Sequence, residues 1–332
     1  MDWDLGWFAI FVGPILAAAL VSSFVPRFMA WHNRARAVAW GFRADETPPP
    51  FVTRGLASLY RGSLVGMALG LAVGFAVASL HGETDGTELL SIDGAVPVGC
   101  VLGVFVSGIN VEARRSNSPI RVARLRTVSL SDYVLPLFRL VVWAAIALCV
   151  AQTALAALLA VSYPSRANHA RVESSLWTCS LLTGGALVAL LVFEVAGRVL
   201  VRRPQVAASD DELVWGDALR GTVLNFMLGA PLFVGVFAAQ QSFFLIDAPV
   251  QWVQVVVWVP EAAIGLALIV GGVVVSRRGP QRQYLRRLWP KRARECDQTV
   301  APGNYWAEVA EHEALNNRRR LKREAAKGGV AP

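Results

Sequence analysis

Charged residues and cysteines are both scarce in this sequence. Charged residues make up 17% of its 332 residues, against about 25% in an average soluble protein. So low a share argues against a cytosolic enzyme and excludes an intrinsically disordered chain. The four cysteines include no C-x-x-C pair and no metal-ligand spacing, which excludes a disulfide-stapled secreted domain and a cysteine-held metal.

Sequence motifs of common enzymes are also missing. The chain contains no H-E-x-x-H, no G-x-S-x-G and no Walker A motif. Its four histidines lie outside the apolar stretches, and no apolar stretch carries a pair of carboxylates. We therefore expect a non-enzymatic protein with no metal and no cofactor, which cannot drive ATP-dependent work by itself.

Apolar residues, in contrast, are abundant and occur in long runs. They make up 55% of the chain, and the mean hydropathy is +0.46. About 20 apolar residues of helix cross a hydrocarbon core about 30 Å thick. The runs are continuous and do not alternate, so they predict helices and not the strands of a β-barrel. We expect an all-α bundle of about seven transmembrane helices over residues 1–276. The predicted spans are residues 7–29, 63–80, 95–111, 134–161, 176–200, 222–245 and 252–276.

Basic residues are concentrated on one side of these spans. The segments on the other side contain only two basic residues, Arg166 and Arg171, together with several acidic residues. The positive-inside rule then predicts an N-terminus outside and a C-terminus in the cytoplasm. The first run lacks the basic start of a signal peptide, so we interpret it as a span. We expect a multi-pass protein of the cytoplasmic (inner) membrane, and the preference for arginine over lysine indicates a bacterial source.

The last part of the chain, residues 277–332, is a basic tail. Residues 281–289 have the pattern of an amphipathic helix that lies on an anionic membrane surface. We expect Arg282, Arg286 and Arg287 to contact anionic lipid there. Because the positive-inside rule already explains the basic residues, nucleic acid is not an expected partner.

Small residues recur every four positions in the second and third predicted spans. This spacing lets two helix backbones approach closely. The glycines fit either packing inside the chain or packing between copies in a homo-oligomer. They are Gly62, Gly66, Gly70, Gly74, Gly99 and Gly103.

Polar residues inside the spans are the candidates for function, because burying them in lipid is costly. Glu261 lies near the middle of the last span, directly after Pro260, which leaves one backbone carbonyl without its helical donor. Asn225, Gln240 and Gln241 of the preceding span could partner Glu261 across a tight hairpin. The alternative for Glu261 and for these three residues is a structural role in hydrogen bonding between helices.

Five further charged or aromatic residues near span ends have simple interpretations. Glu194 and Arg198 are four residues apart, so we expect them to pair on one helix face. Arg139 is expected to extend its guanidinium to the membrane interface. Trp31 and Trp215 fall near the predicted inner boundary, where indole rings commonly form an aromatic belt.

These observations lead to three functional hypotheses. The first is a permease-like subunit of a transport system, which works with a cytosolic partner such as an ATPase. The prolines inside several spans and Glu261 support this hypothesis. The alternative is a scaffolding membrane protein that recruits partners through its tail. A lipid-modifying enzyme with Glu261 as base is the third, and it lacks a second catalytic group at the same depth.

Overall fold

The structure is a computed structural model, and every secondary-structure element in its described residues is helical. The described residues are 21–43, 46–81, 87–115, 128–162, 169–205, 207, 209–243, 282–299, 314 and 318.

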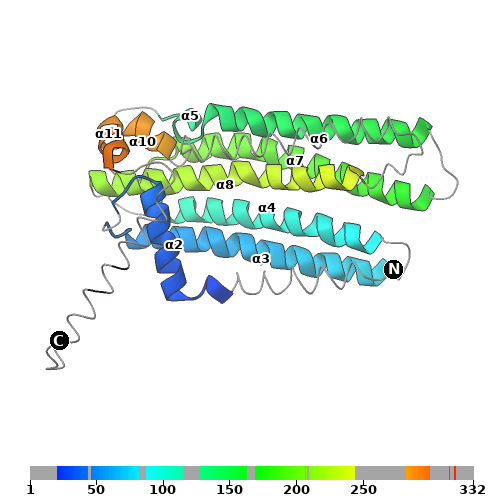
Figure 1. Cartoon of the computed structure of the whole chain (residues 1–332), viewed down its shortest axis with the longest axis horizontal. Coiled ribbons are helices and arrows are strands. Elements are labelled where there is room, and N and C mark those ends of the chain that lie inside the picture. Colours follow the sequence, from blue (N-terminus) through cyan, green and yellow to red (C-terminus); the bar gives the residue numbers. More distant parts are fainter. Residues whose placement is uncertain are drawn as a thin grey trace, which may run out of the picture.

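In the part of the chain that the structure describes, five long helices run side by side along the longest axis of the molecule (Figure 1). Each contains a stretch long and apolar enough to cross a membrane, and these stretches overlap the second to sixth predicted spans. The all-helical class is therefore confirmed. The helices are α3 (Pro50–His81), α4 (Thr87–Arg115), α6 (Pro136–Ser162), α7 (His169–Arg202) and α8 (Asp210–Phe243).

The first and last predicted spans have a different outcome. Residues 252–276 lie outside the described residues, as do residues 7–20 of the first span. The described part of the first span is not one continuous helix, because the chain turns at Ser23 and Phe24. Helix α2 (Pro26–Ala39) then starts afresh, with proline in its first turn. The described residues therefore do not continue one helix up to the predicted end of the first span at residue 29.

Four helices begin earlier than the predicted spans, and the difference is largest for α3 and α8. Helix α3 starts at Pro50 and not at residue 63, and α8 starts at Asp210 and not at residue 222. Ser209 accepts a hydrogen bond from the Glu212 N–H at 3.2 Å, and acidic residues fill the first turn of α8. Both features stabilise a helix N-terminus that is built from polar and charged residues. Hydropathy alone marks only the part of a helix that matches the hydrocarbon core.

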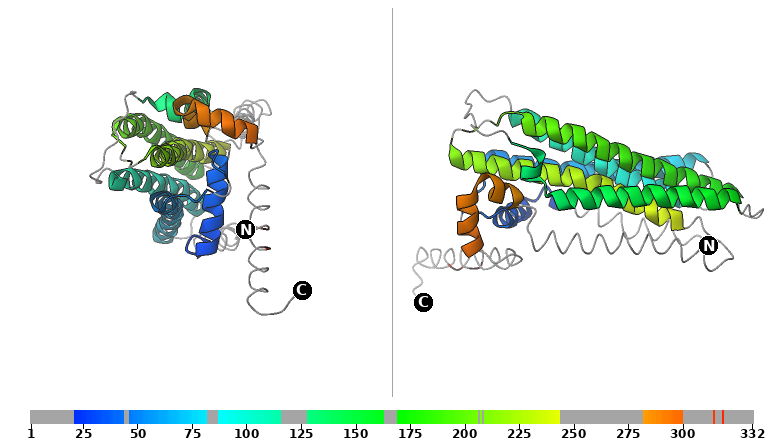
Figure 2. Two further views of the ribbon diagram at one scale, coloured as in Figure 1. Left: turned by 90° about the vertical axis from the view of Figure 1, so that its left-hand side faces the viewer. Right: turned by 90° about the horizontal axis from the view of Figure 1, so that it is seen from above.

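The short elements gather at one end of the bundle, which we call the capped end. It is the end where α3, α6 and α8 begin and where α4 and α7 finish. Helix α2 lies across the bundle there, and α5, α10 and α11 share the same end (Figures 1 and 2). The bounds of the last three are Leu130–Tyr133, Gln283–Leu288 and Pro290–Thr299.

Helix α8 forms the centre of the bundle. The share of its apolar stretch that is buried is 72%, against 28% for α3 and for α6. The outer helices carry apolar side chains on the outside, such as Leu69, Leu140 and Leu181, which are 62%, 64% and 69% exposed. Large exposed apolar surfaces of this kind suit contact with lipid chains and not with water.

Helices α3 and α4 touch through their backbones. A Cβ atom added to Gly66 would lie 2.2 Å from the carbonyl oxygen of Gly99, and a Cβ atom added to Gly99 would lie 2.2 Å from the carbonyl oxygen of Gly66. The same crowding recurs at Gly103, 2.1 Å from the Gly62 oxygen, and at Gly70, 2.2 Å from the Ala95 oxygen. Only hydrogen fits at these positions. Five of the six glycines singled out in the sequence lie in this contact inside the chain, and Gly74 is buried in α3.

An alanine at Gly66 should disrupt this contact. We expect Gly66→Ala to lower the free energy of unfolding by ~1–3 kcal/mol, because the helices must separate to admit the methyl group. Gly184→Ala is the matched control, since nothing lies within 4 Å of a Cβ there; it should leave stability unchanged or raise it by up to ~1 kcal/mol through helix propensity. Thermal unfolding in detergent measures both, and equal effects would contradict the close contact.

Candidate functional site

A buried carboxylate lies at the capped end of the central helix. Asp217 of α8 is 0% exposed. It accepts hydrogen bonds from the Tyr133 hydroxyl at 2.7 Å and from the Trp289 indole N–H at 2.8 Å. Tyr133 ends α5, whose turn is held by a hydrogen bond from the Ser129 N–H to Asp132 at 2.8 Å. These donors replace the water that burial removes. One carboxylate therefore joins α8, α5 and the C-terminal segment, residues 282–299.

An ion pair is buried one turn further along α8. Arg220 donates to Oε2 of Glu112 in α4 from Nη2 at 2.9 Å and from Nε at 3.3 Å. The two side chains are 4% and 2% exposed. A third donor, Nη1, binds the Arg203 carbonyl beyond α7 at 3.2 Å. Asp217 also lies within electrostatic reach of Arg220. Leaving one such buried charge without its partner would be strongly destabilising.

The C-terminal segment, residues 282–299, holds the end of α2. Arg282 donates to the carbonyl oxygens of Val38 and Ala39, each at 3.2 Å. These carbonyls belong to the last turn of α2, where helical donors run out. The Tyr284 hydroxyl donates to the Trp40 carbonyl at 3.2 Å. The C-terminal segment thus caps α2 with side-chain donors.

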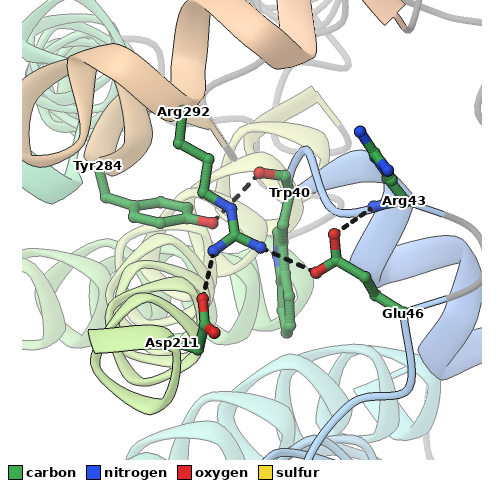
Figure 3. Close-up of polar contacts among 6 residues, drawn as sticks. All are labelled: Trp40, Arg43, Glu46, Asp211, Tyr284 and Arg292. Carbon is green, nitrogen blue, oxygen red and sulfur yellow. Dashed lines mark hydrogen bonds and ion pairs between the residues drawn. The ribbon is translucent and has the colours of Figure 1, made fainter. Parts of the chain in front are cut away.

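The side chain of Arg292 makes a second set of contacts between the C-terminal segment and the rest of the protein (Figure 3). Its Nη2 lies 2.8 Å from Glu46 and its Nη1 lies 2.9 Å from Asp211. The guanidinium also lies over the ring of Phe42, 4.9 Å from its centroid. Phe42 in turn stacks on Trp215 of α8. Arg292 therefore links the connection between α2 and α3 to the start of α8.

The intramembrane site proposed from the sequence is not assembled by the described residues. Glu261 lies outside them. Gln240 and Gln241 belong to the far end of α8. Asn225 lies about 22 Å away from Gln240 at 1.5 Å per residue, and its amide donates to the Gly221 carbonyl at 2.7 Å. Asn225 therefore cannot share one compact site with both glutamines, and their pairing with Glu261 stays a prediction.

The basic residues singled out in the sequence divide into two groups. Arg282 is only 6% exposed and donates to carbonyl oxygens inside the protein. It therefore does not lie on the surface, contrary to the expected contact with lipid. Arg286 and Arg287 are exposed, and their contact with lipid stays a prediction. The expected pair of Glu194 and Arg198 is confirmed, with a distance of 3.5 Å.

Sequence reasoning missed the buried cluster of Glu112, Tyr133, Asp217, Arg220 and Trp289. Its members come from four separate segments, and each looks like an ordinary boundary residue on its own. The available signal was the occurrence of acidic residues, Glu112 and Asp217, on the basic side of the membrane. Among the described residues, no group of three or more His, Cys, Asp or Glu side chains could hold a metal ion.

The fold and the cluster together define the class of this protein. Its described residues form an all-helical bundle with a packed cap on one end, and five helices long and apolar enough to cross a membrane indicate a multi-pass membrane protein. Comparison with protein-family models, with curated proteins and with solved structures finds no match.

Replacing Asp217 by Asn removes the negative charge and keeps the shape of the side chain. We expect Asp217→Asn to lower the free energy of unfolding by ~1–3 kcal/mol, because two buried donors lose a charged acceptor. Asp211→Asn is the matched control on the same helix, since the Asp211 side chain is 81% exposed, and its cost should stay below ~1 kcal/mol. Thermal unfolding and trypsin cleavage after Arg286 compare the two. Equal losses would contradict the role of Asp217.

We expect the imidazole of His32 to make the attachment of α2 sensitive to pH. His32 packs between Phe28 and Tyr60, with ring centroids at 6.2 and 5.5 Å. Burial, and secondarily the charge of Arg36, lowers the pKa of His32 below its ordinary value of 6.5. The unfolded chain therefore binds more protons below that pH, and stability falls as the pH falls.

We expect the thermal midpoint Tm to drop between about pH 7.5 and about pH 5.5, as protonation of His32 opposes the fold. His32→Gln removes the titrating group, so it should flatten this part of the pH profile. Scanning fluorimetry of both proteins across the range provides the measurement. An unchanged slope in the variant would assign the pH dependence to other groups.

Proposed function

We propose that this chain is a non-enzymatic subunit of the cytoplasmic membrane that binds a cytosolic protein on its capped end. One observation carries the proposal: the C-terminal segment is fixed onto the bundle and presents a basic outer face. The exposed basic residues of this face are Arg286, Arg287, Lys291 and Arg294.

The interior contacts of the C-terminal segment support a docking role. Arg282, Tyr284 and Trp289 each bind the rest of the protein. A surface held in place loses less conformational entropy on binding than a loose tail does. Its positive charge would favour an acidic surface on the partner and speed the encounter.

The location of further basic residues supports the proposed orientation. Arg43, Arg54, Arg202 and Arg203 are all exposed at the capped end. By the positive-inside rule, this end would face the cytoplasm. The capped end would then be the face that a cytosolic protein meets.

Within this proposal, we favour a permease-like subunit. Asp217 connects the C-terminal segment directly to α8, the central helix, so a partner bound at the cap has a direct mechanical path into the bundle. Prolines lie inside α4 and α8, at Pro97 and Pro231, as is common in transport proteins. The alternative is a scaffold that moves no solute, and the backbone contact between α3 and α4, which admits no side chain, favours it.

Purification of the full chain from native membranes in mild detergent tests the proposal. We expect a cytosolic protein at stoichiometric yield, identified by mass spectrometry. Arg286→Gln with Arg287→Gln should reduce its yield about tenfold, as loss of charge complementarity predicts. The matched control is Arg43→Gln with Arg54→Gln, which removes the same charge from another exposed part of the capped end.

The identity of the captured protein separates the two forms of the proposal. An ATPase would support the permease-like subunit, and a protein without nucleotide-binding motifs would support the scaffold. Absence of any stoichiometric protein, or equal losses in the two double variants, would overturn docking at the C-terminal segment.

A further inference from the structure

Two arginines from neighbouring helices share one carboxylate. Arg139 of α6 binds Glu194 of α7 with both Nε, at 2.5 Å, and Nη2. Arg198, one turn after Glu194, lies 3.5 Å from the same carboxylate. The Trp143 indole N–H also donates to it, at 3.2 Å. Glu194 is 9% exposed as a side chain and is thus a buried anchor for two guanidiniums.

The group lies at the capped end of both apolar stretches. Arg139 is close to the start of the stretch Pro136–Leu155, and Arg198 is close to the end of the stretch Cys179–Arg202. This is the depth at which a spanning helix meets lipid headgroups. Apolar side chains on both helices are exposed beside the arginines. They are Leu137, Leu140, Val195 and Val199, which are 41%, 64%, 65% and 48% exposed.

The charges of this group do not balance. Two guanidiniums meet one carboxylate, and Arg139 already satisfies Glu194 with two hydrogen bonds. The Arg139 and Arg198 side chains remain 35% and 62% exposed. A guanidinium presents paired N–H donors that match phosphate oxygens. At headgroup depth, the phosphates of the bilayer are the available anions.

We propose that Arg139 and Arg198 form a binding site for the phosphate group of an anionic phospholipid. Glu194 holds the two guanidiniums side by side, and the acyl chains lie on the exposed apolar surface of α6 and α7. Basic sites between spanning helices recognise acidic headgroups by the same electrostatics. This site lies on the side of the bundle and is independent of the surface proposed for a protein partner.

Lipid titration of the full chain, purified in a neutral detergent, tests the site. Native mass spectrometry would measure binding of phosphatidylglycerol and of phosphatidylcholine. We expect a preference for phosphatidylglycerol, which Arg198→Gln reduces about fivefold through the loss of one positive charge near the headgroup. The matched control is Arg54→Gln, which alters another exposed arginine at the capped end. The affinity of this variant for phosphatidylglycerol should stay within about twofold of that of the unaltered protein.

Two further measurements keep the proposal falsifiable. Glu194→Gln removes the charge that competes with the headgroup but keeps an amide oxygen that can accept from Arg139, so phosphatidylglycerol affinity should stay equal or rise. A fall with an unchanged Tm would overturn the proposal. Millimolar inorganic phosphate should not displace phosphatidylglycerol. Complete displacement would show a site for small anions and not for lipid, and an equal affinity for the two lipids would also refute it.

Discussion

Helix α8 carries an arginine and an aspartate into the interior of an apolar bundle, and the structure of the capped end follows from the need to pair them. An isolated buried charge would cost several kcal/mol. Glu112 of α4 neutralises Arg220, while Tyr133 and Trp289 donate to Asp217. Each partner comes from a different part of the chain. Pairing two charges therefore brings α4, α5 and the C-terminal segment to the same end of α8.

Hydropathy alone was enough to predict the helical class and the existence of α3, α4, α6, α7 and α8. Helix ends were predicted less well, because a helix continues into water until a cap or a proline stops it. Pro26 begins a new helix inside the first predicted span, and α8 begins directly after Ser209, well before the predicted start of its span at residue 222. These local signals are visible in the sequence, but they are weaker than a long apolar run.

The candidate site could not be predicted in the same way. Arg220 contributes to the count of basic residues that sets orientation, although it is only 3% exposed. Trp215 has the position of an aromatic-belt residue, yet it is buried in a stack with Phe42. In both cases the partner lies far away in the sequence. Single-residue patterns give the depth of a side chain in the membrane, whereas only the fold gives its neighbour.

Three arginine sites among the described residues differ in their ratio of carboxylates to guanidiniums. Buried Arg220 has Glu112 as its direct partner and Asp217 nearby. Half-buried Arg292 has two carboxylates, Glu46 and Asp211. Arg139 and Arg198 have Glu194 between them. Where water or lipid is excluded, the protein must supply every counter-charge. The cation excess occurs at the lipid-facing pair, because there a bilayer can supply the missing anion.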